Sequence, residues 1–497
     1  MAATAAVDWH TQAKGLEFRS QAFIGGKYVS AASGNTFENI SPIDGKLLAR
    51  VASCDAEDVD RAVKAARAAF NKASWSDAPP KQRKRTLQKF AELIVRHADE
   101  LALLETLDMG KPIGFARSVD INAVAETVRW YAEAIDKIYD EIAPTPKNAL
   151  GLITREPLGV VAAVVPWNFP LLMAAWKFAP ALAAGNSLIL KPAEQSPLSA
   201  LRVAELAAEA GIPEGVFNVL PGYGETAGQA IGRHMDIDAV AFTGSTEVGK
   251  FFLKYAGESN MKIVSLECGG KTPNIVFADA PNLDGAAQSA AAGIFFNSGQ
   301  VCVAASRLLV EESIHDAFVE KVKAMANVFQ PGDPLDTKTM MGSMVDKTQM
   351  ERVLSYVEKG KKDGAALAVG GKQVRSETGG YYIEPTIFDR VANDMTIARE
   401  EIFGPVLATL TFKDTDEAVK IANDSVYGLQ ASLWTNDLSK AHKVSRALRA
   451  GTVNVNNVDG GGIEMPFGGY KQSGFGRDKS LHALEKYTQL KATYITF

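Results

Sequence analysis

The sequence has little of the chemistry on which disulfide-stapled or metal-dependent domains rely. Only three cysteines occur in 497 residues, too few for a disulfide framework, and their odd number leaves at least one thiol free. Six histidines are scattered without the spacing of metal ligands, so we expect no metal site. Free thiols favour a reducing compartment, and we therefore expect a cytoplasmic protein.

An excess of positive charge is missing as well. Lysine and arginine total 53 against 58 for aspartate and glutamate, and no basic run marks a nucleic-acid surface. The start, MAATAAVDWH, lacks the pattern of a secretory signal, and LKATYITF carries no lipidation signal. The uncharged stretch 157–176 has Pro166, Asn168 and Pro170 at its middle, which predicts strand, loop and helix instead of a membrane span. We expect neither nucleic acid nor a membrane as a partner.

What is present is the pattern of a large α/β protein. The length suits about three structural units, and 46% hydrophobic with 22% charged residues is typical of compact globular chains. Apolar residues at helical spacing predict helices over 56–70 and 82–108. Over 157–266 short β-rich runs alternate with helices, which predicts right-handed βαβ units in a parallel sheet. A ligand crevice is expected at the carboxyl ends of its strands.

A second alternating series begins at NIVF (274–277) and predicts another α/β unit. It continues with a helix over 283–297 and the runs SRLLV, LATLTF, EAVKIAND, ASLW and GTVNVNN. The glycines 269 and 270 mark the expected boundary, because flexible backbone can pass there from one sheet to the next. Segments 142–156 and 490–497 fit neither series. Short strands without a home sheet often pair with another subunit, which indicates an oligomer.

The first apparent chemical motif is misleading. Residues 244–250, GSTEVGK, have the glycine and lysine spacing of a phosphate-binding P-loop. Phe251 stands where that loop needs Ser or Thr to hold magnesium, and the charge of Glu247 opposes a triphosphate. A helix beginning after a strand still suits one phosphate of a dinucleotide. The dinucleotide fingerprint G-x-G-x-x-G is absent, since Pro166 to Pro170 (PWNFP) stands at the first strand–helix turn.

Cys302 and Glu267 are the candidate reactive residues. Cys302 follows a predicted helix among small residues that would let a reactant approach, although an arbitrary cysteine is more often a buried structural thiol, as we expect for Cys54 and Cys268. No histidine signature accompanies it, so a papain-like hydrolase has no visible base. Glu267 ends a β-run beside glycines, where a carboxylate can reach into a cleft as a base.

At this point the sequence resembles the aldehyde dehydrogenase superfamily, from about Phe23 to Thr496. The resemblance rests on ordered motifs: PWNFP (166–170), KPAEQSP (191–197), FTGSTEVG (242–249), LECGGK (266–271), GQVC (299–302), EEIFGPV (400–406) and PFGGYKQSG (466–474). Cys268 replaces the commoner leucine of the family, a change expected to affect packing more than chemistry. The implied fold is α/β and aldehyde dehydrogenase-like. It has a Rossmann-type NAD-binding domain (1–135 and 157–266), an α/β catalytic domain (267–480) and a small β oligomerisation element (136–156 and 481–497).

The resemblance also implies roles for individual residues. Cys302 is expected to attack the aldehyde as a thiolate, the Asn168 amide and the Cys302 N–H to hold the oxyanion, and Glu267 to activate water against the thioester. The residues implied for the cofactor are Trp167, Lys191, Glu194, Gly244, Ser245, Glu401 and Phe403. Those implied for the substrate are Asp120, Phe169, Trp176, Asp459, Glu464 and Phe467. Taken singly, each also has an ordinary structural interpretation, for example Asn168 as a turn former.

NAD is the expected cofactor, with NADP also accepted, and a homodimer or homotetramer is the expected assembly. The stretches 129–145 and 476–491 resemble bacterial enzymes that oxidise γ-glutamyl-γ-aminobutyraldehyde or 4-guanidinobutyraldehyde, so the expected substrate is an ω-amino, ω-guanidino or γ-glutamylamino butyraldehyde. Asp120, Asp459 and Glu464 would then form an acidic mouth. Alternatives are a general aliphatic or betaine-type aldehyde dehydrogenase, an NAD-independent thiol hydrolase and an inactive structural relative. Glu267 disfavours a CoA-acylating enzyme, a branch that typically lacks this base.

Overall fold

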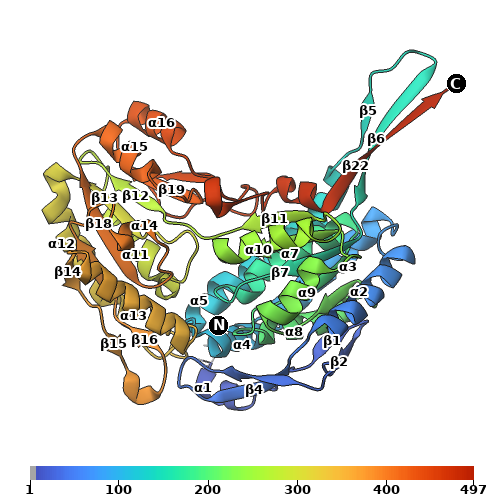
Figure 1. Cartoon of the computed structure of the whole chain (residues 1–497), viewed down its shortest axis with the longest axis horizontal. Helices are drawn as coiled ribbons and strands as arrows, with labels where there is room; N and C mark the ends of the chain where they lie inside the picture. The colour runs from blue at the N-terminus through green and yellow to red at the C-terminus, as the bar shows by residue number, and fades with distance from the viewer. Residues whose placement is uncertain (1–6) are drawn as a thin grey trace, which may run out of the picture.

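The computed structural model describes residues 7–497, so the first six residues of the expected unit 1–135 lie outside it. Its largest sheet has eight strands, of which the central ones are parallel and the edge strands antiparallel (Figure 1). In spatial order they are β2 (Lys27–Val29), β1 (Ala22–Ile24), β9 (Phe217–Val219), β8 (Ser187–Lys191), β7 (Val160–Val164), β10 (Ala239–Thr243), β11 (Ile263–Glu267) and β21 (Gly474–Phe475).

The strand order reverses between β7 and β10, and this reversal positions the site. From β7 the chain runs outward through β8 to β9, and then returns to add β10 and β11 on the other side of β7. In the parallel register Val164 lies beside Lys191, and Thr243 lies beside Glu267. The residues that follow these strands therefore meet at one edge of the sheet, at the point where open α/β sheets bind ligands.

Alternation along the central strands divides the apolar core in two. Val160 and Ala162 of β7 face one core with α2 (Ala56–Asn71), α9 (Gln229–Arg233) and α10 (Thr246–Gly257). Val161 and Ala163 face the other core. The helices of that face are α3 (Pro80–Arg96), α4 (Ala98–Met109), α6 (Ile121–Ala134), α7 (Pro170–Ala184) and α8 (Leu198–Ala210). Burial on both faces explains why these strands are nearly continuous hydrophobic runs.

The second sheet has seven strands and is covered by helices in the same way. In spatial order its strands are β14 (Ala366–Val369), β17 (Thr386–Asp389), β18 (Val406–Phe412), β13 (Arg307–Glu311), β12 (Pro273–Val276), β19 (Gln430–Trp434) and β20 (Thr452–Val455). Helices α11 (Leu283–Phe295) and α12 (His315–Ala326) pack on one face. Helices α13 (Lys347–Lys362), α15 (Thr415–Asn423) and α16 (Leu438–Ala447) pack on the other. Gly269 and Gly270 lie between β11 and β12, where the chain leaves the first sheet for the second. The expected pair of α/β sheets is confirmed.

Two details differ from the sequence expectations. The helix expected over 82–108 is two helices, α3 and α4, because the backbone of His97 leaves the helical region at φ −100° and ψ 20°. Strand β21, within the unit expected over 267–480, pairs with β11 in the first sheet.

The smaller elements are α1 (Trp9–Lys14), the hairpin β3 (Thr36–Ile40) and β4 (Leu47–Ala52), α5 (Ile113–Phe115), the pair β15 (Gln373–Val374) and β16 (Tyr382–Ile383), and α14 (Thr396–Arg399).

A third sheet projects from the body of the molecule and ends at the C-terminus (Figure 1). It joins β22 (Thr488–Thr496), β6 (Ala149–Pro157) and β5 (Glu141–Ala143), so the two segments that fitted neither series pair with each other. Tyr139, Ile142, Leu490 and Tyr494 are exposed on and beside it. Within residues 7–497 no helix combines the length and apolarity that a membrane crossing requires.

Candidate functional site

Two hollows meet at the edge of the first sheet, and Cys302 lines both. The inner cavity, of about 200 Å³, is lined among others by Trp167, Gly244, Glu267 and Glu401. The tunnel, of about 690 Å³, is lined among others by Asp120, Phe169, Trp176, Asp459 and Phe467. Asn168, Ser245 and Phe403 also line the inner cavity. A thiol at the junction of two hollows can meet one reactant from each side.

The loop that carries Cys302 is bonded to the loop that carries Asn168. After α11 the chain makes a tight turn in which Asn297 and Ser298 have φ values of 50° and 56°, in the left-handed region. The Asn297 side chain donates to the Asn168 carbonyl at 2.9 Å, and the Asn168 side chain donates to the Gln300 carbonyl at 2.9 Å. These reciprocal bonds hold the Asn168 amide at the base of the cysteine loop.

The environment of Cys302 disfavours its anion. Burial raises the pKa of the Cys302 thiol to about 12, and the nearby charges of Glu401 and Glu267 act in the same direction. Hydrogen bonds from the backbone N–H groups of Val303 and Cys302 oppose the rise. The resting thiol is therefore protonated at neutral pH, and its attack on a carbonyl requires a base or an added positive charge.

Glu267 has the properties of a general base. It is 3% exposed, and neither carboxylate oxygen has a hydrogen-bond partner among the described residues. Burial raises the pKa of Glu267 well above its usual range. Asp478 raises it further, while Lys177, Lys486 and Arg477 act to lower it. A carboxylate that makes no other bonds is free to accept a proton from a thiol or a water molecule.

A buried charge cluster lies near Glu267. The two carboxylate oxygens of Asp478 accept one hydrogen bond each from the ammonium groups of Lys177 and Lys486. All three side chains are 7% exposed or less. Two lysines and one aspartate leave one positive charge in excess, which matches the single negative charge of an ionised Glu267. The sequence patterns did not single out this cluster, because Lys177 and Asp478 lie 301 residues apart.

Glu401 also lines the inner cavity, where its carboxylate lies beside Gly269 and Gly270. The N–H of Gly270 donates to Glu401 Oε1 at 3.0 Å, and a Cβ atom on Gly269 would lie 1.9 Å from Oε2. Only glycine at 269 thus leaves room for this carboxylate. Burial raises the pKa of Glu401 to about 7. Trp167 and Phe403 meet edge to face, with their centroids 5.2 Å apart.

The remaining polar groups expected for the cofactor lie along the same sheet edge. Ser245 caps α10, its hydroxyl accepting from Val248 N–H at 3.2 Å, so the start of that helix faces the inner cavity beside Gly244. Lys191, the last residue of β8, and Glu194, on the loop that follows this strand, lie outside the lining of the inner cavity. The Lys191 ammonium is 3.7 Å from the Glu194 carboxylate. Burial lowers the pKa of Lys191.

Comparison with known proteins identifies the family. A model of the aldehyde dehydrogenase family matches residues 28–493. The chain belongs to this family. It is 54% identical over 488 residues to the NADP/NAD-dependent aldehyde dehydrogenase PuuC of Escherichia coli, covering 98% of both chains. Indole-3-acetaldehyde dehydrogenase in complex with NAD+ superimposes with a TM-score of 0.98 at 60% identity, covering 99% of both chains. A γ-glutamyl-γ-aminobutyraldehyde dehydrogenase from Burkholderia cenocepacia gives 0.97 at 58% identity, covering 98% of this chain and 99% of its own.

In this aldehyde dehydrogenase the expected acidic mouth is not formed. Asp120 is fully buried and ion-paired with Lys111, whose ammonium is also 3.6 Å from the Phe169 ring centroid. Glu464 does not line the tunnel, and its carboxylate accepts from Gly462 N–H at 3.0 Å on the exposed loop. Asp459 does line the tunnel, but Lys479 lines it too and brings the opposite charge. The three carboxylates could be identified in the sequence, but the positions of Lys111 beside Asp120 and of Lys479 in the tunnel could not.

The expected apolar wall of the tunnel is present. Trp176 and Phe467 lie 5.1 Å apart between centroids, and Phe169 packs against Phe296 at 6.2 Å. All four line the tunnel with Met173. Phe296 and Met173 were not singled out by the sequence patterns, although Phe296 lies six residues before Cys302. The wall gives the tunnel a wide apolar surface.

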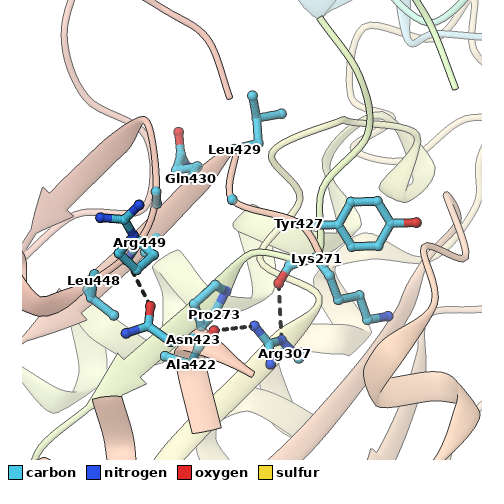
Figure 2. A pocket seen from close by; sticks show the side chains of 13 residues that line it. Lys271, Pro273, Arg307, Ala422, Asn423, Tyr427, Leu429, Gln430, Leu448 and Arg449 are labelled. Atoms are coloured by element: carbon cyan, nitrogen blue, oxygen red, sulfur yellow. Dashed lines mark hydrogen bonds between the residues drawn. The ribbon is translucent and has the colours of Figure 1, made fainter. Parts of the chain in front are cut away.

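Figure 2 shows a third hollow, lined among others by Lys271 and Pro273, where the chain enters the second sheet. Arg307 lies beneath it and donates to the carbonyls of Lys271 at 3.1 Å, Ile421 at 3.1 Å and Ala422 at 2.9 Å. This hollow offers only about 10 Å³, the room of one water molecule at most. Arg307 therefore fixes the glycine-rich crossing to the second sheet, and the hollow is not a ligand site.

Proposed function

We propose that the protein oxidises an aldehyde to its carboxylic acid with NAD or NADP, through a covalent intermediate on Cys302. The observation that carries this proposal is the position of Cys302, which lines the inner cavity and the tunnel at once. The tunnel presents the aldehyde to one side of the sulfur, and the inner cavity presents the reactive end of the cofactor to the other. Glu267 and Asn168 line the inner cavity beside them.

The residues of the inner cavity, together with the Lys191–Glu194 pair outside it, fit a dinucleotide. The start of α10 with Gly244 and Ser245 suits the pyrophosphate, because free N–H groups at a helix start favour an anion. The carboxylate of Glu401 suits the ribose next to the nicotinamide, and Trp167 and Phe403 border the same space. The Lys191–Glu194 pair suits the ribose at the adenine end. When bound, the cofactor accepts a hydride from the aldehyde carbon.

Oxidation begins at the sulfur. Cys302 transfers its thiol proton to a base and its sulfur adds to the aldehyde carbon, giving a thiohemiacetal oxyanion. The Asn168 amide has a second N–H besides the one that bonds to Gln300, and together with the Cys302 N–H it can donate to this oxyanion. Loss of hydride from the same carbon leaves a thioester on Cys302.

Hydrolysis of the thioester completes the reaction. The ionised carboxylate of Glu267 accepts a proton from water while the oxygen adds to the thioester carbon. The carbon–sulfur bond then breaks, the acid leaves, and Cys302 regains a proton. The excess positive charge of Lys177 and Lys486 over Asp478 favours the ionised form of Glu267, against the effect of burial.

The activity is tested by following NADH with a panel of aldehydes, with and without CoA. We expect acid formation without CoA, and no NADH from Cys302→Ala. NADH formed only with CoA would indicate an acylating enzyme, and acid released from esters without any NADH from aldehydes would indicate a thiol hydrolase. Absence of every activity would indicate a structural relative.

For the substrate we propose a butyraldehyde with an ω-amino, ω-guanidino or γ-glutamylamino tail. Asp120 Oδ1 is buried without a partner among residues 7–497, and Asp120 lines the tunnel. It is an acceptor for an N–H group of the tail, while its ion pair with Lys111 removes most of its long-range attraction. The similarity to PuuC and to γ-glutamyl-γ-aminobutyraldehyde dehydrogenase supports this class.

An uncharged aromatic or aliphatic aldehyde is the second candidate. The wall of Phe169, Trp176 and Phe467 and the similarity to indole-3-acetaldehyde dehydrogenase favour it. We would compare kcat/KM for 4-guanidinobutyraldehyde, hexanal and indole-3-acetaldehyde in the wild type and in Asp120→Asn. A nitrogen-bearing substrate predicts a selective loss for the first compound in the variant. Equal losses for all three, or a wild-type preference for an uncharged aldehyde, would favour the second candidate.

We further propose that the projecting sheet associates with a second copy in a dimer or tetramer, and that the enzyme works in the cytoplasm. The outer edge of β22 and the exposed Ile142, Leu490 and Tyr494 support the association. Three free cysteines support a reducing compartment. Removal of 488–497 should lower the mass measured by light scattering to that of a single chain.

A further inference from the structure

We propose that helix α4 is a brace with two arms, in which Glu105 positions the Asn168 loop and Asp108 separately positions the loop of Lys191 and Glu194. The proposal rests on the function proposed above, because it assigns those two loops to the oxyanion and to the cofactor. Glu105 and Asp108 are three residues apart in α4, so they share one face of the helix, and they are 0% and 1% exposed.

Two of the helices that begin near the site, α7 and α8, have no side-chain cap of their own, unlike α10, which Ser245 caps. Helix α7 starts with Pro170, and no side chain at its N-cap position accepts a hydrogen bond. Helix α8 follows Pro197 and likewise has no side-chain cap. Buried N–H groups at a helix start need an acceptor, and an uncapped start is free to fray.

Helix α4 supplies both acceptors. Glu105 Oε1 accepts from the N–H of Leu171 at 2.7 Å, which is the first N–H of α7 after Pro170. Asp108 Oδ2 accepts from the N–H of Leu198, the first residue of α8, at 2.9 Å. Glu105 therefore holds the end of the Asn168 loop at the start of α7, and Asp108 holds the end of the Lys191–Glu194 loop at the start of α8.

Further contacts strengthen each arm separately. Lys111, which follows α4, places its ammonium on the ring of Phe169, directly after Asn168. On the other arm, the Asn39 side chain donates both to Asp108 Oδ1 at 2.8 Å and to the Gln195 carbonyl at 3.1 Å, directly after Glu194. One contact crosses between the arms, since the Ser199 hydroxyl of α8 donates to Glu105 at 3.2 Å.

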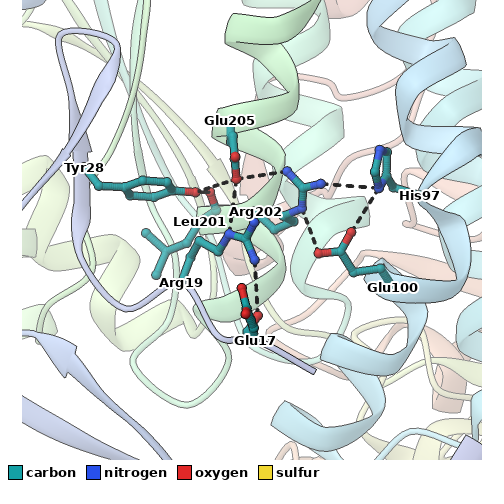
Figure 3. Close-up of polar contacts among 8 residues, drawn as sticks. All are labelled: Glu17, Arg19, Tyr28, His97, Glu100, Leu201, Arg202 and Glu205. Atoms are coloured by element: carbon teal, nitrogen blue, oxygen red, sulfur yellow. Dashed lines mark hydrogen bonds and ion pairs between the residues drawn. The ribbon is translucent and has the colours of Figure 1, made fainter. Parts of the chain in front are cut away.

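The same helix provides a matched control. Glu100 lies near the start of α4 and also contacts α8, but its partners are Arg202 at 2.8 Å and His97 at 3.0 Å, in the polar network of Figure 3. Arg202 lies one turn inside α8, away from the helix start. Glu100→Gln therefore removes a carboxylate of α4 without touching either loop.

The test measures two quantities in every variant. They are the rate of the NADH burst at saturating NAD, and the Kd of NAD from quenching of tryptophan fluorescence. Glu105→Leu fills the volume but removes the acceptor, and should slow the burst about tenfold while the Kd changes less than twofold. Asp108→Ala should raise the Kd about tenfold and leave the burst rate within twofold. Glu100→Gln should change neither quantity.

Conservative variants separate the hydrogen bond from the charge. Glu105→Gln retains an acceptor and should burst like the wild type, whereas Glu105→Asp retains the charge but is one methylene too short and should behave like Glu105→Leu. This pair decides the question if Glu105→Leu does not fold. A slow burst in Glu105→Gln together with a wild-type burst in Glu105→Asp would overturn the brace. The brace would also be overturned if the variants at 105 and 108 changed the burst rate and the Kd of NAD by the same factor.

Amide hydrogen exchange gives the same readout without turnover. We expect faster exchange confined to 168–173 in Glu105→Asp and to 195–201 in Asp108→Ala, and equal exchange of both segments in both variants would overturn the proposal. If the wild type formed no NADH from any aldehyde, the proposed function would fail, while these exchange patterns would still decide whether the brace exists.

Discussion

Replacement of Glu267 by glutamine tests the central step of the proposed mechanism. The variant keeps the size of a side chain that is 3% exposed and removes its ability to accept a proton. General-base catalysis contributes about 10²- to 10⁴-fold, or about 3–5 kcal/mol of barrier. We expect the larger end of this range, because both oxygens of Glu267 lack other partners among the described residues and its whole acceptor capacity is free.

Rapid mixing of enzyme and NAD with aldehyde separates the two halves of the reaction. Glu267→Gln should release one NADH per site in a fast burst and then turn over 10²- to 10⁴-fold more slowly than the wild type, because the thioester accumulates. Acid quenching should recover the acyl group on Cys302. A steady rate within tenfold of the wild type would refute the assignment of Glu267 to hydrolysis.

The rate of the burst in Glu267→Gln shows whether Glu267 also deprotonates the Cys302 thiol. With a thiol pKa of about 12, only about one Cys302 in 10⁴ is a thiolate at pH 8 before ligands bind. If Glu267 is also the base for Cys302, the burst slows together with turnover and no thioester accumulates. If a positive charge brought by the bound cofactor lowers the thiol pKa instead, the burst remains fast.

Four further outcomes follow from the same geometry. Cys302→Ala should abolish NADH formation with an unchanged Kd for NAD, and turnover near the wild-type rate would contradict covalent catalysis. Glu194→Gln should raise the ratio of kcat/KM for NADP over NAD by about tenfold, since the carboxylate repels an added ribose phosphate, and an unchanged ratio would separate Glu194 from the ribose. The folded pKa of Glu401, about 7 against an ordinary 4.5, means that its contribution to stability is full below pH 4.5 and is lost as pH rises through 7, by up to about 3 kcal/mol. Between pH 5.5 and 8.5 the free energy of unfolding from urea titration should fall by about 2 kcal/mol more in the wild type than in Glu401→Gln. Arg307→Met should lower the free energy of unfolding by about 3 kcal/mol, because the buried carbonyls of Lys271 and Ala422 lose this donor, and an unchanged urea midpoint would contradict that anchoring role.

Much of the fold could be predicted from local patterns. The runs VVAAVV and SLIL became β7 and β8, and NIVF and SRLLV became β12 and β13, because strands buried on both faces are continuous apolar runs bounded by turns. The return of β21 to the first sheet could not be predicted. It is two residues long, and its pairing with β11 depends on a contact between Leu266 and Phe475 that no periodicity encodes.

In the candidate site, too, some features could be predicted from the sequence and others could not. The resemblance to the aldehyde dehydrogenases implied that Cys302, Glu267, Asn168, Glu401 and Phe403 belong together, and the structure brings all five to the inner cavity. Their roles remain predictions. The cluster around Asp478 and the caps from α4 were missed, because each joins residues that are far apart in the chain and ordinary in their own neighbourhoods.

The acidic mouth failed for a reason that applies to any substrate argument drawn from charges in a sequence. A carboxylate attracts a distant cation only by its unpaired charge, and a buried ion pair leaves little field beyond its own dipole. Asp120 next to Lys111 therefore contributes an acceptor at contact distance instead of long-range steering. For the proposed substrate class, selection of the aldehyde depends on whether its tail donates to Asp120 while it packs on Trp176 and Phe467, so we predict a preference that is almost independent of ionic strength.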